Sequence, residues 1–269
     1  MWSPDRPRWR IGMSSHQLVR TRGRLGWLAR DLVFDSVAVE PVSQDMPWRA
    51  AVDALARWLG AANTRPPLVQ IVLSGSFLRW QLLDWRAELS GQQEMAAYAK
   101  LRFADTFGKP ADAWQILHAI QPPGRPTPAC AAEVALLQAL QGACREAGAR
   151  LDLVVPYFAS AADHWRSKLG KGTTWFGLIE PDWLSLGLLH QGSWQALRAQ
   201  RIDGDLHSVL PGLMTRMAVS AGGLRSPAQI YLAGASVSPA SLADLPFEWL
   251  RPAGAAGAGT DARRLALGI

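Results

Sequence analysis

Apolar residues in the stretch 173–201 fall into three short runs that are separated by two breaks. The runs cover residues 174–179, 183–190 and 194–199. The breaks are Glu180-Pro181-Asp182 and Gln191-Gly192-Ser193. Proline, aspartate and glycine between runs of tryptophan, phenylalanine and leucine are typical of strands joined by tight turns. The pattern therefore predicts a three-stranded antiparallel meander.

A helix and a further strand are expected directly after this meander. Apolar residues recur at steps of three and four over 204–221, which predicts a helix. Pro211 lies inside this helix, and we expect a kink there because proline lacks the amide donor. A last apolar run over 229–233 predicts another strand. The whole unit has the order β-β-β-α-β.

The N-terminal part of the chain shows the same order of elements. Strands are expected over residues 10–20, 25–28 and 32–39, a helix over 47–59 and a strand over 68–73. The last strand has the sequence LVQIVL, which is apolar enough to be covered on both faces. The two units share almost no residue identity, so the duplication rests on element order and hydropathy.

The segment between the two units predicts a smaller α/β insertion. Strands are expected over 77–83, 114–120 and 129–134, and a helix over 90–107. Ser90 and Gln93 have the capping-box spacing that opens such a helix. After the insertion, a helix over 135–147, a strand over 151–155 and a helix over 157–169 lead back to the first unit.

The chain is long enough for two lobes of roughly 100 to 150 residues each. We expect a first lobe over 1–170, with an inserted subdomain over about 75–134, and a second lobe over 171–269. The second lobe is expected to end with a strand over 247–250, an Ala/Gly-rich segment and a C-terminal helix over 261–267. The predicted fold class is α/β with two lobes.

Composition narrows the class of protein. Apolar residues make up 49% of the chain, which is enough to bury a core. The best uncharged stretch, 226–243, is broken by prolines, a glycine and serines, so it does not resemble a membrane-spanning helix of roughly 18 or more apolar residues. The first ten residues, MWSPDRPRWR, are not followed by the apolar segment of a signal peptide. We therefore expect a cytoplasmic protein.

The net charge of +6 arises from 24 arginines and 4 lysines that are spread along the chain. A dispersed arginine excess is typical of a solvated surface, so no nucleic-acid partner is expected. The exception is an N-terminal set that could meet an acidic partner or anionic lipid headgroups. It consists of Arg6, Arg8, Arg10, Arg20, Arg22, Arg24 and Arg30. Trp2 and Trp9 are the tryptophans that we expect outside the core.

The chain lacks the common catalytic and metal-binding motifs. Its histidines fall in five separate elements without metal-ligand spacing; they are His16, His118, His164, His190 and His207. Cys130 and Cys144 are expected to be reduced thiols in the core. The stretch Gly170-Lys171-Gly172-Thr173 is no phosphate loop, because Trp165 stands where that motif needs glycine. We expect no catalytic residues, no metal and no cofactor.

Four segments together resemble one branch of the actin-like ATPase superfamily. They are LVQIVLSGSFLRWQLLDW, AAYAKLRFADTFGKPADAWQILHAI, LDLVVPYFASAADHW and ARRLALGI. In this order they resemble the cytoplasmic domain of the type II secretion protein GspL and the type IV pilus assembly protein PilM. The resemblance implies a two-lobed actin-like fold, made of duplicated RNase H-like β-β-β-α-β units with a small α/β insertion in the first lobe.

In this superfamily, each lobe binds phosphate at the turn between its first two strands. The resemblance places these turns at Gly12 to His16 and at Glu180 to Trp183, and the adenosine-side loop at Gly234 to Ser236. If a nucleotide binds, the residues implied are Gly12, Ser14, Ser15, Asp182, Gly234 and Ser236. The first turn has no carboxylate, and in the second Pro181 removes a donor and Trp183 replaces a glycine. We therefore expect a degenerate site.

The resemblance implies a non-catalytic scaffold at the cytoplasmic face of the inner membrane. Its expected partners are inner-membrane pilus or secretion assembly proteins, through a short cytoplasmic peptide of a bitopic partner, and the assembly ATPase. The resemblance leaves open whether the protein forms a homodimer. One alternative is an ATP-binding actin-like or sugar-kinase-like phosphotransferase with atypical phosphate loops. Another is an RNase H-like nuclease, but its metals need clustered carboxylates and the strand over 10–20 has none.

Overall fold

The computed structural model describes residues 8–22, 33–40, 46–61, 67–89, 91–170, 172–202, 205–223, 229–234, 246–251 and 260–269. The chain divides into two compact units. The first unit contains Met1–Phe77, Val134–Ser160 and Gly254–Ile269, and the second contains Leu78–Glu133 and Ala161–Ala253. Within the described residues, no helix has both the length and the apolar composition needed to cross a membrane.

The first unit is built on a five-stranded sheet with the order β3-β2-β1-β4-β8. Its strands are β1 (Arg8–Met13), β2 (Gln17–Arg22), β3 (Val33–Ala38), β4 (Leu68–Leu73) and β8 (Arg150–Pro156). Strand β2 runs antiparallel to both of its neighbours, β1 and β3, whereas β4 is parallel to both β1 and β8. The sheet is therefore mixed, with its parallel part in the half that receives the connections through helices.

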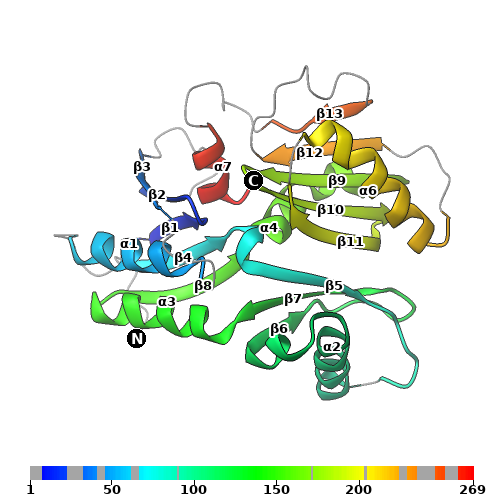
Figure 1. Cartoon of the computed structure of the whole chain (residues 1–269), viewed down its shortest axis with the longest axis horizontal. Coiled ribbons are helices and arrows are strands. Elements are labelled where there is room, and N and C mark those ends of the chain that lie inside the picture. The colour runs from blue at the N-terminus through cyan, green and yellow to red at the C-terminus, as the bar shows by residue number, and fades with distance from the viewer. Residues whose placement is uncertain are drawn as a thin grey trace. The chain divides into compact units, whose positions relative to one another are not determined.

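Helices cover both faces of this first sheet. Helices α1 (Arg49–Gly60) and α3 (Val134–Glu146) lie together on one face, and α7 (Thr260–Leu267) lies on the other (Figure 1). Strand β1 shows why both faces are covered, since Trp9, Ile11 and Met13 alternate with Arg10 and Gly12 and nearly all of them are buried.

Two sequence predictions for this unit were wrong. The single strand that the apolar pattern predicted over 10–20 is a hairpin, because a turn at Ser14–His16 divides it into β1 and β2. This turn lies within the stretch Gly12 to His16, where the resemblance had placed one. Trp9, expected outside the core, is buried with 5% of its surface exposed. The strand expected over 25–28 and Trp2 lie outside the described residues.

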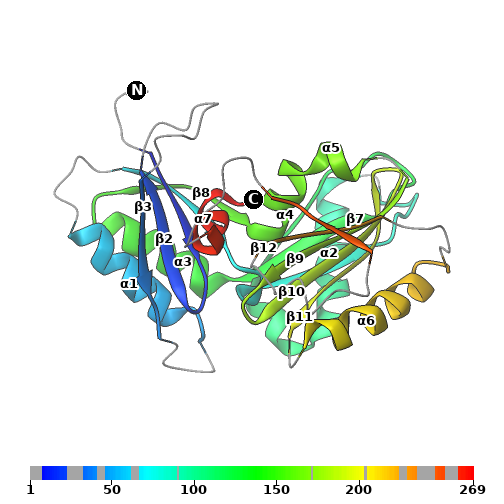
Figure 2. The same cartoon turned by 90° about the horizontal axis from the view of Figure 1, so that it is seen from above.

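The second unit contains a sheet with the order β11-β10-β9-β12-β13. Its strands are β9 (Thr173–Glu180), β10 (Trp183–His190), β11 (Ser193–Arg201), β12 (Gln229–Gly234) and β13 (Phe247–Trp249). Helix α6 (Leu206–Ser220) packs on one face through Leu206, Leu210 and Leu213 (Figure 2). Each position in this sheet corresponds to one in the first, so the duplicated β-β-β-α-β order is confirmed.

The predicted hairpins of this sheet are confirmed. Strand β9 pairs antiparallel with β10, and β10 with β11. In the second turn, Gln191 and Gly192 have φ of 50° and 73°. Positive φ at both central residues is what a type I′ turn requires, and its twist matches that of the flanking strands.

The inserted segment forms a separate antiparallel sheet in the second unit, with the order β5-β7-β6. Its strands are β5 (Leu78–Leu83), β6 (Trp114–His118) and β7 (Thr127–Glu133), and the 3-10 turns η2 (Gly75–Phe77) and η3 (Lys109–Ala113) precede β5 and β6. Helix α2 (Gln92–Phe107) covers one face (Figure 1). Phe103 of α2 is fully buried there, and its ring meets Trp114 edge to face at 6.5 Å.

The start of α2 differs from the predicted capping box. The Gly91 amide donates to Glu94 Oε2 at 3.1 Å. This is the bond from the N-cap amide to the third helical side chain in a capping box, and it lies one residue later than the predicted pair Ser90 and Gln93. Ser90 lies outside the described residues.

The C-terminal helix α7 belongs by its contacts to the first unit, where it packs on β1 and β2. Its expected place in the second lobe was therefore wrong. Local periodicity identified the helix, but the strand that it covers is about 250 residues earlier in the chain. The remaining helices, α4 (Tyr157–His164) and α5 (Arg166–Leu169), connect β8 to β9.

Candidate functional site

The first hairpin that could bind phosphate is closed by hydrogen bonds of its own. Ser14 Oγ accepts from the amides of His16 at 3.3 Å and Gln17 at 3.1 Å. The Ser14 amide donates to Gln17 O at 3.0 Å. Ser14 and Ser15 are buried, with 5% and 8% of their surface exposed. Three amides of this turn are thus already satisfied, whereas a phosphate-binding turn presents its amides to the ligand.

Gly12 has a packing role on the same hairpin. A Cβ at Gly12 would lie 2.6 Å from Ala266 N and 2.7 Å from the Leu265 side chain. Real side chains do not approach backbone so closely, so only glycine lets α7 lie against β1 at this point. The close approach of α7 explains why residue 12 is a glycine, and no bound ligand is needed for that explanation.

The end of the chain is held beside α7 by polar contacts. The Tyr157 hydroxyl donates to Ile269 O at 2.9 Å, and Arg10 Nη2 donates to Ser160 Oγ at 3.1 Å. Burial lowers the pKa of Arg10 from its ordinary value. Arg10 is therefore a structural residue of the first unit.

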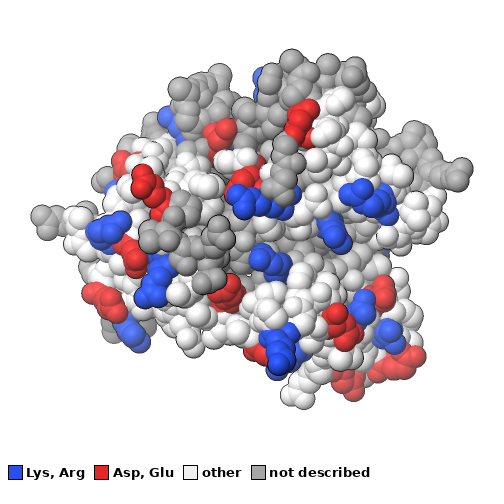
Figure 3. Space-filling model, in the orientation of Figure 1, with Lys and Arg blue, Asp and Glu red and all other residues white. Residues whose placement is uncertain are grey.

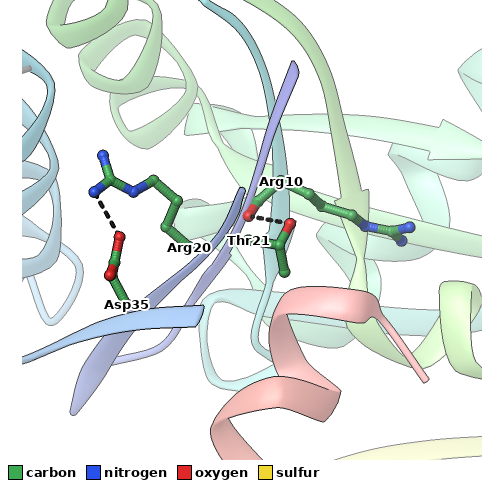
Figure 4. Close-up of polar contacts among 4 residues, drawn as sticks. All are labelled: Arg10, Arg20, Thr21 and Asp35. Atoms are coloured by element: carbon green, nitrogen blue, oxygen red, sulfur yellow. Dashed lines mark hydrogen bonds and ion pairs between the residues drawn. The ribbon is translucent and has the colours of Figure 1, made fainter. Parts of the chain in front are cut away.

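Arg20 is structural as well. Its guanidinium forms a 2.8 Å ion pair with Asp35 and lies 4.3 Å from the ring centre of Trp9 and 4.5 Å from that of Trp58. Figure 4 shows Arg10 and Arg20 pointing away from each other across the strands, with Thr21 donating to Arg10 O. Arg10 and Arg20 belong to the N-terminal set that was predicted to meet a partner, but their side chains make contacts within the first unit. Arg6, Arg24 and Arg30 of the same set lie outside the described residues.

The second hairpin connects β9 to β10 through Pro181 and Asp182 alone. Glu180 is buried, with 4% of its surface exposed, and the Asp182 carbonyl accepts from the Ile202 amide at 3.0 Å. Proline contributes no amide to a ligand. The hairpin therefore has a buried carboxylate at the end of β9, and Pro181 contributes no backbone donor.

Trp183, which the resemblance implies stands in place of a glycine, opens β10 directly after this hairpin. The guanidinium of Arg79, from β5 of the inserted sheet, lies 5.8 Å from its ring centre. Burial lowers the pKa of Arg79, and the nearby Glu133 carboxylate opposes that shift. Sequence reasoning missed this contact, since nothing in the local pattern connects β5 with a hairpin a hundred residues later.

Gly234, at the end of β12, is fixed by backbone packing. Its φ is +98°, and a Cβ there would collide with the Ile179 carbonyl oxygen. Gly234 pairs with Ile179 of β9, so Gly234 and the hairpin with Asp182 lie at the same end of the second sheet. Ser236 lies outside the described residues. Of the predicted site residues, the structure thus brings together Gly12, Ser14 and Ser15 in one unit and Asp182 and Gly234 in the other.

The other reactive side chains have structural surroundings. Burial raises the pKa of Cys144 to about 11 and raises that of Cys130 still further. His190 Nδ1 lies 2.9 Å from Thr173 Oγ1, which is its direct neighbour on β9. In the part of the chain that the structure describes, no three His, Cys, Asp or Glu side chains lie close enough to hold a metal ion.

Comparisons with known proteins place this fold among solved structures. No protein-family profile matches the chain. No curated protein matches its sequence.

Solved structures match over nearly the whole chain at low sequence identity. A protein with an actin-like ATPase fold and unknown function from Bacteroides thetaiotaomicron has 11% identity, 91% coverage of each chain and a TM-score of 0.61. The cytoplasmic domain of EpsL, an inner-membrane component of the Vibrio cholerae type II secretion system, has 11% identity, covers 97% of this chain and 92% of its own, and gives a TM-score of 0.55. A chain of a PilM–PilN type IV pilus biogenesis complex has 14% identity, 90% and 88% coverage and a TM-score of 0.60. The chain therefore has the two-lobed actin-like fold.

Proposed function

We propose that this actin-like protein is a non-catalytic scaffold of a type IV pilus or type II secretion assembly platform. In this role it links inner-membrane assembly proteins to the assembly ATPase at the cytoplasmic face of the inner membrane. A short cytoplasmic peptide of a bitopic partner recruits it. The similarity in fold to the EpsL cytoplasmic domain and to the PilM–PilN complex supports this choice.

The observation that carries the proposal is the closed first hairpin. Ser14 Oγ accepts from two amides of its own turn, and Gly12 is needed for the contact with α7. Bound phosphate would have to break these hydrogen bonds before forming new ones. Each replaced bond would offset part of the gain from binding, since a net intramolecular hydrogen bond contributes about 0.5–1.5 kcal/mol.

The distribution of charge is compatible with a protein partner. On the face shown in Figure 3, basic and acidic side chains of the described residues lie among one another. A nucleic-acid surface instead gathers basic side chains, because phosphate neutralisation supplies most of its affinity. This supports partners of mixed surface charge.

The first test is thermal unfolding of the purified protein with and without ATP and magnesium. A ligand that binds only the folded state stabilises it by RT ln(1 + [L]/Kd), about 2.7 kcal/mol at 100 times Kd. We expect no shift of Tm at millimolar nucleotide. A clear shift that Ser14→Ala changes would contradict the proposal.

The second test uses the host organism. A strain that lacks the gene should lose pili or secretion, and a copy with Glu180→Ala and Asp182→Ala should restore them. These carboxylates would hold magnesium in a working ATPase of this fold. Failure of the double variant to restore assembly, with the protein present at normal level, would favour an active nucleotide site.

An ATP-binding phosphotransferase is the second candidate, and one observation favours it. The second hairpin keeps the carboxylates of Glu180 and Asp182 at its two ends. If this reading is right, ATP raises Tm and the double variant abolishes the shift.

A further inference from the structure

Nearly all of the net positive charge of the chain belongs to the first unit. This unit contains 14 basic and 9 acidic residues, whereas the second unit contains 14 and 13. Arg20 and Arg264 of the first unit are buried and form ion pairs within it. The charge that this unit can offer to a partner is therefore carried by its exposed arginines.

Two exposed arginines lie at the end of the first sheet where its parallel strands begin. Strand β1 starts at Arg8 and β8 starts at Arg150. Leu68, the first residue of β4, pairs with Arg8 on one side and with Arg150 on the other. The two arginines therefore lie in one row across the sheet, two strand spacings or about 10 Å apart.

The last turns of α1 and α3 bring two more exposed arginines to this end. The two helices lie side by side, and they lead into the starts of β4 and β8 (Figure 1). Arg57 is in the last turn of α1 and Arg145 is in the last turn of α3. The ring of Trp58, next to Arg57, lies over the same guanidinium as the ring of Trp9, so this turn of α1 lies at the beginning of β1.

We call these four exposed residues the basic end; they are Arg8, Arg57, Arg145 and Arg150. In the part of the chain that the structure describes, none of their side chains forms an ion pair. Only Arg8 belongs to the N-terminal set predicted from the sequence. The other three arginines come to the same end through the order of strands and helices.

The carboxylates near the basic end lie mostly further from it than the arginines do. Glu146 is exposed in the last turn of α3 and is the exception. Asp53 lies one turn earlier on α1, and Asp152 lies two residues further along β8, where its carboxylate accepts from Gln70 Nε2 at 3.4 Å. On α1 and β8, an anionic partner that approaches this end therefore meets the arginine first.

The arrangement of the basic end suits an extended anionic surface. A single phosphate is held by donors that converge on it, such as the fork of one guanidinium or a nest of amides. Four arginines from four different elements instead present separate charges. Protein interfaces have an apolar centre, but among the described residues Leu153 is the only large exposed apolar side chain of the first unit, and it lies beyond Asp152 on β8.

We propose that the basic end adsorbs the first unit to the anionic phospholipid headgroups of a membrane surface. The choice of a lipid surface rests on the proposed function, which places the protein at the inner membrane. Cytoplasmic leaflets have a negative surface potential, and clusters of roughly four to eight basic residues bind to them. The contact is reversible and weakens with salt, because salt screens exposed charges.

Co-sedimentation of the purified protein with lipid vesicles tests the proposal. The protein should bind vesicles that contain phosphatidylglycerol at low ionic strength, and not vesicles of phosphatidylcholine alone. Each arginine at a lipid surface contributes about fivefold to the partition coefficient, which corresponds to about 1 kcal/mol. Arg8→Gln/Arg150→Gln should therefore lower the partition coefficient roughly 25-fold.

Matched variants separate the position of the charge from its amount. Arg125→Gln/Arg216→Gln removes the same net charge from exposed residues of the second unit and should bind nearly as wild type. Arg8→Lys/Arg150→Lys keeps the charge and should retain binding, since a diffuse surface requires charge and not the guanidinium fork. Arg57→Gln/Arg145→Gln gives a second test of the basic end should the first variant fail to fold in circular dichroism melts.

The absence of wild-type binding to anionic vesicles at low ionic strength would overturn the proposal. Equal losses in the basic-end variant and in Arg125→Gln/Arg216→Gln would also overturn it, because binding would then follow net charge alone. Loss of binding in the lysine variant would replace a diffuse lipid surface with a guanidinium-specific site. Binding of duplex DNA or polyglutamate without binding of vesicles would assign the basic end to nucleic acid or to an acidic protein. The vesicle assay needs no assembly partner, so its failure leaves the scaffold proposal to the tests described for it.

Discussion

Arg20 and Asp35 lie directly opposite each other on β2 and β3, and their side chains form a 2.8 Å ion pair. The guanidinium is held between the rings of Trp9 and Trp58, and the Arg20 side chain is only 6% exposed. The pair therefore joins the antiparallel edge of the first sheet to α1. The Arg20 cation is desolvated, so loss of the Asp35 carboxylate would leave a buried charge without its partner and destabilise the fold.

Asp35→Ala should destabilise the protein by about 1–3 kcal/mol, since it takes the carboxylate from a buried charged donor. The urea midpoint of unfolding measures this loss. Asp163→Ala is the matched control, because its ion pair with Arg166 is largely exposed and such pairs contribute roughly 0–1 kcal/mol. Equal midpoint shifts for the two variants would mean that the Arg20 cluster is not a stabilising feature.

Gly12→Ala should loosen α7 from β1. The new methyl would meet the backbone of α7, and overpacking of this kind costs typically about 1–3 kcal/mol. Hydrogen exchange should show faster exchange of the α7 amides without any nucleotide present. Gly60→Ala, at the end of α1 with nothing within 4 Å, should leave stability unchanged or slightly raised. Unchanged protection of α7 in Gly12→Ala would revive a ligand-binding reason for this glycine.

Gly234→Ala should be more damaging than Gly124→Ala, although both glycines have positive φ. Alanine at Gly124 meets nothing within 4 Å, so it bears only the backbone cost of about 1–2 kcal/mol. Alanine at Gly234 adds a collision with Ile179 of β9. Denaturant unfolding of the two variants compares them, and similar losses would show that β12 can shift away from β9.

The buried Cys144 thiol predicts a loss of stability in alkali. Burial raises the pKa of Cys144 to about 11, above the ordinary value of about 8.5 in an unfolded chain. A raised pKa in the folded state means that the thiol's contribution is complete below about pH 8.5 and is lost as the pH rises toward 11, because only the unfolded thiol ionises.

The free energy of unfolding should therefore fall between these pH values. The fall should be smaller in Cys130→Ala/Cys144→Ala, and urea unfolding at several pH values measures it. The same burial predicts that the Cys144 thiol of the folded protein does not react with a disulfide reagent at neutral pH. Rapid reaction of Cys144 in a folded Cys130→Ala variant would contradict its buried position.

Much of the fold could be predicted from local patterns. The turns at Pro181-Asp182 and Gln191-Gly192 and the periodicity of α6 depend on residues close in the chain, so the second β-β-β-α-β unit was predicted in the right order. The hairpin at Ser14 was harder, because a turn without glycine or proline leaves little signal in a strand-like run. The kink expected at Pro211 stays a prediction.

For the candidate phosphate-binding site, the sequence predicted which residues lie in the turns but not the contacts that their side chains make. The sequence indicated that Pro181 and Trp183 do not suit phosphate, and that follows from their own chemistry. The bonds that close the Ser14 turn and the contact between Arg79 and Trp183 depend on side-chain orientation and on elements far apart in the chain. Pattern and propensity carry no information about either.

The sequence by itself determined which segments are strands and helices, since apolar periodicity and turn chemistry act over a few residues. Only the tertiary structure decided what each face meets: α7 on Gly12, Arg20 between two tryptophans, and β6 at an edge. The physical reason is that packing joins residues up to hundreds of positions apart, and many partners satisfy the same apolar pattern equally well.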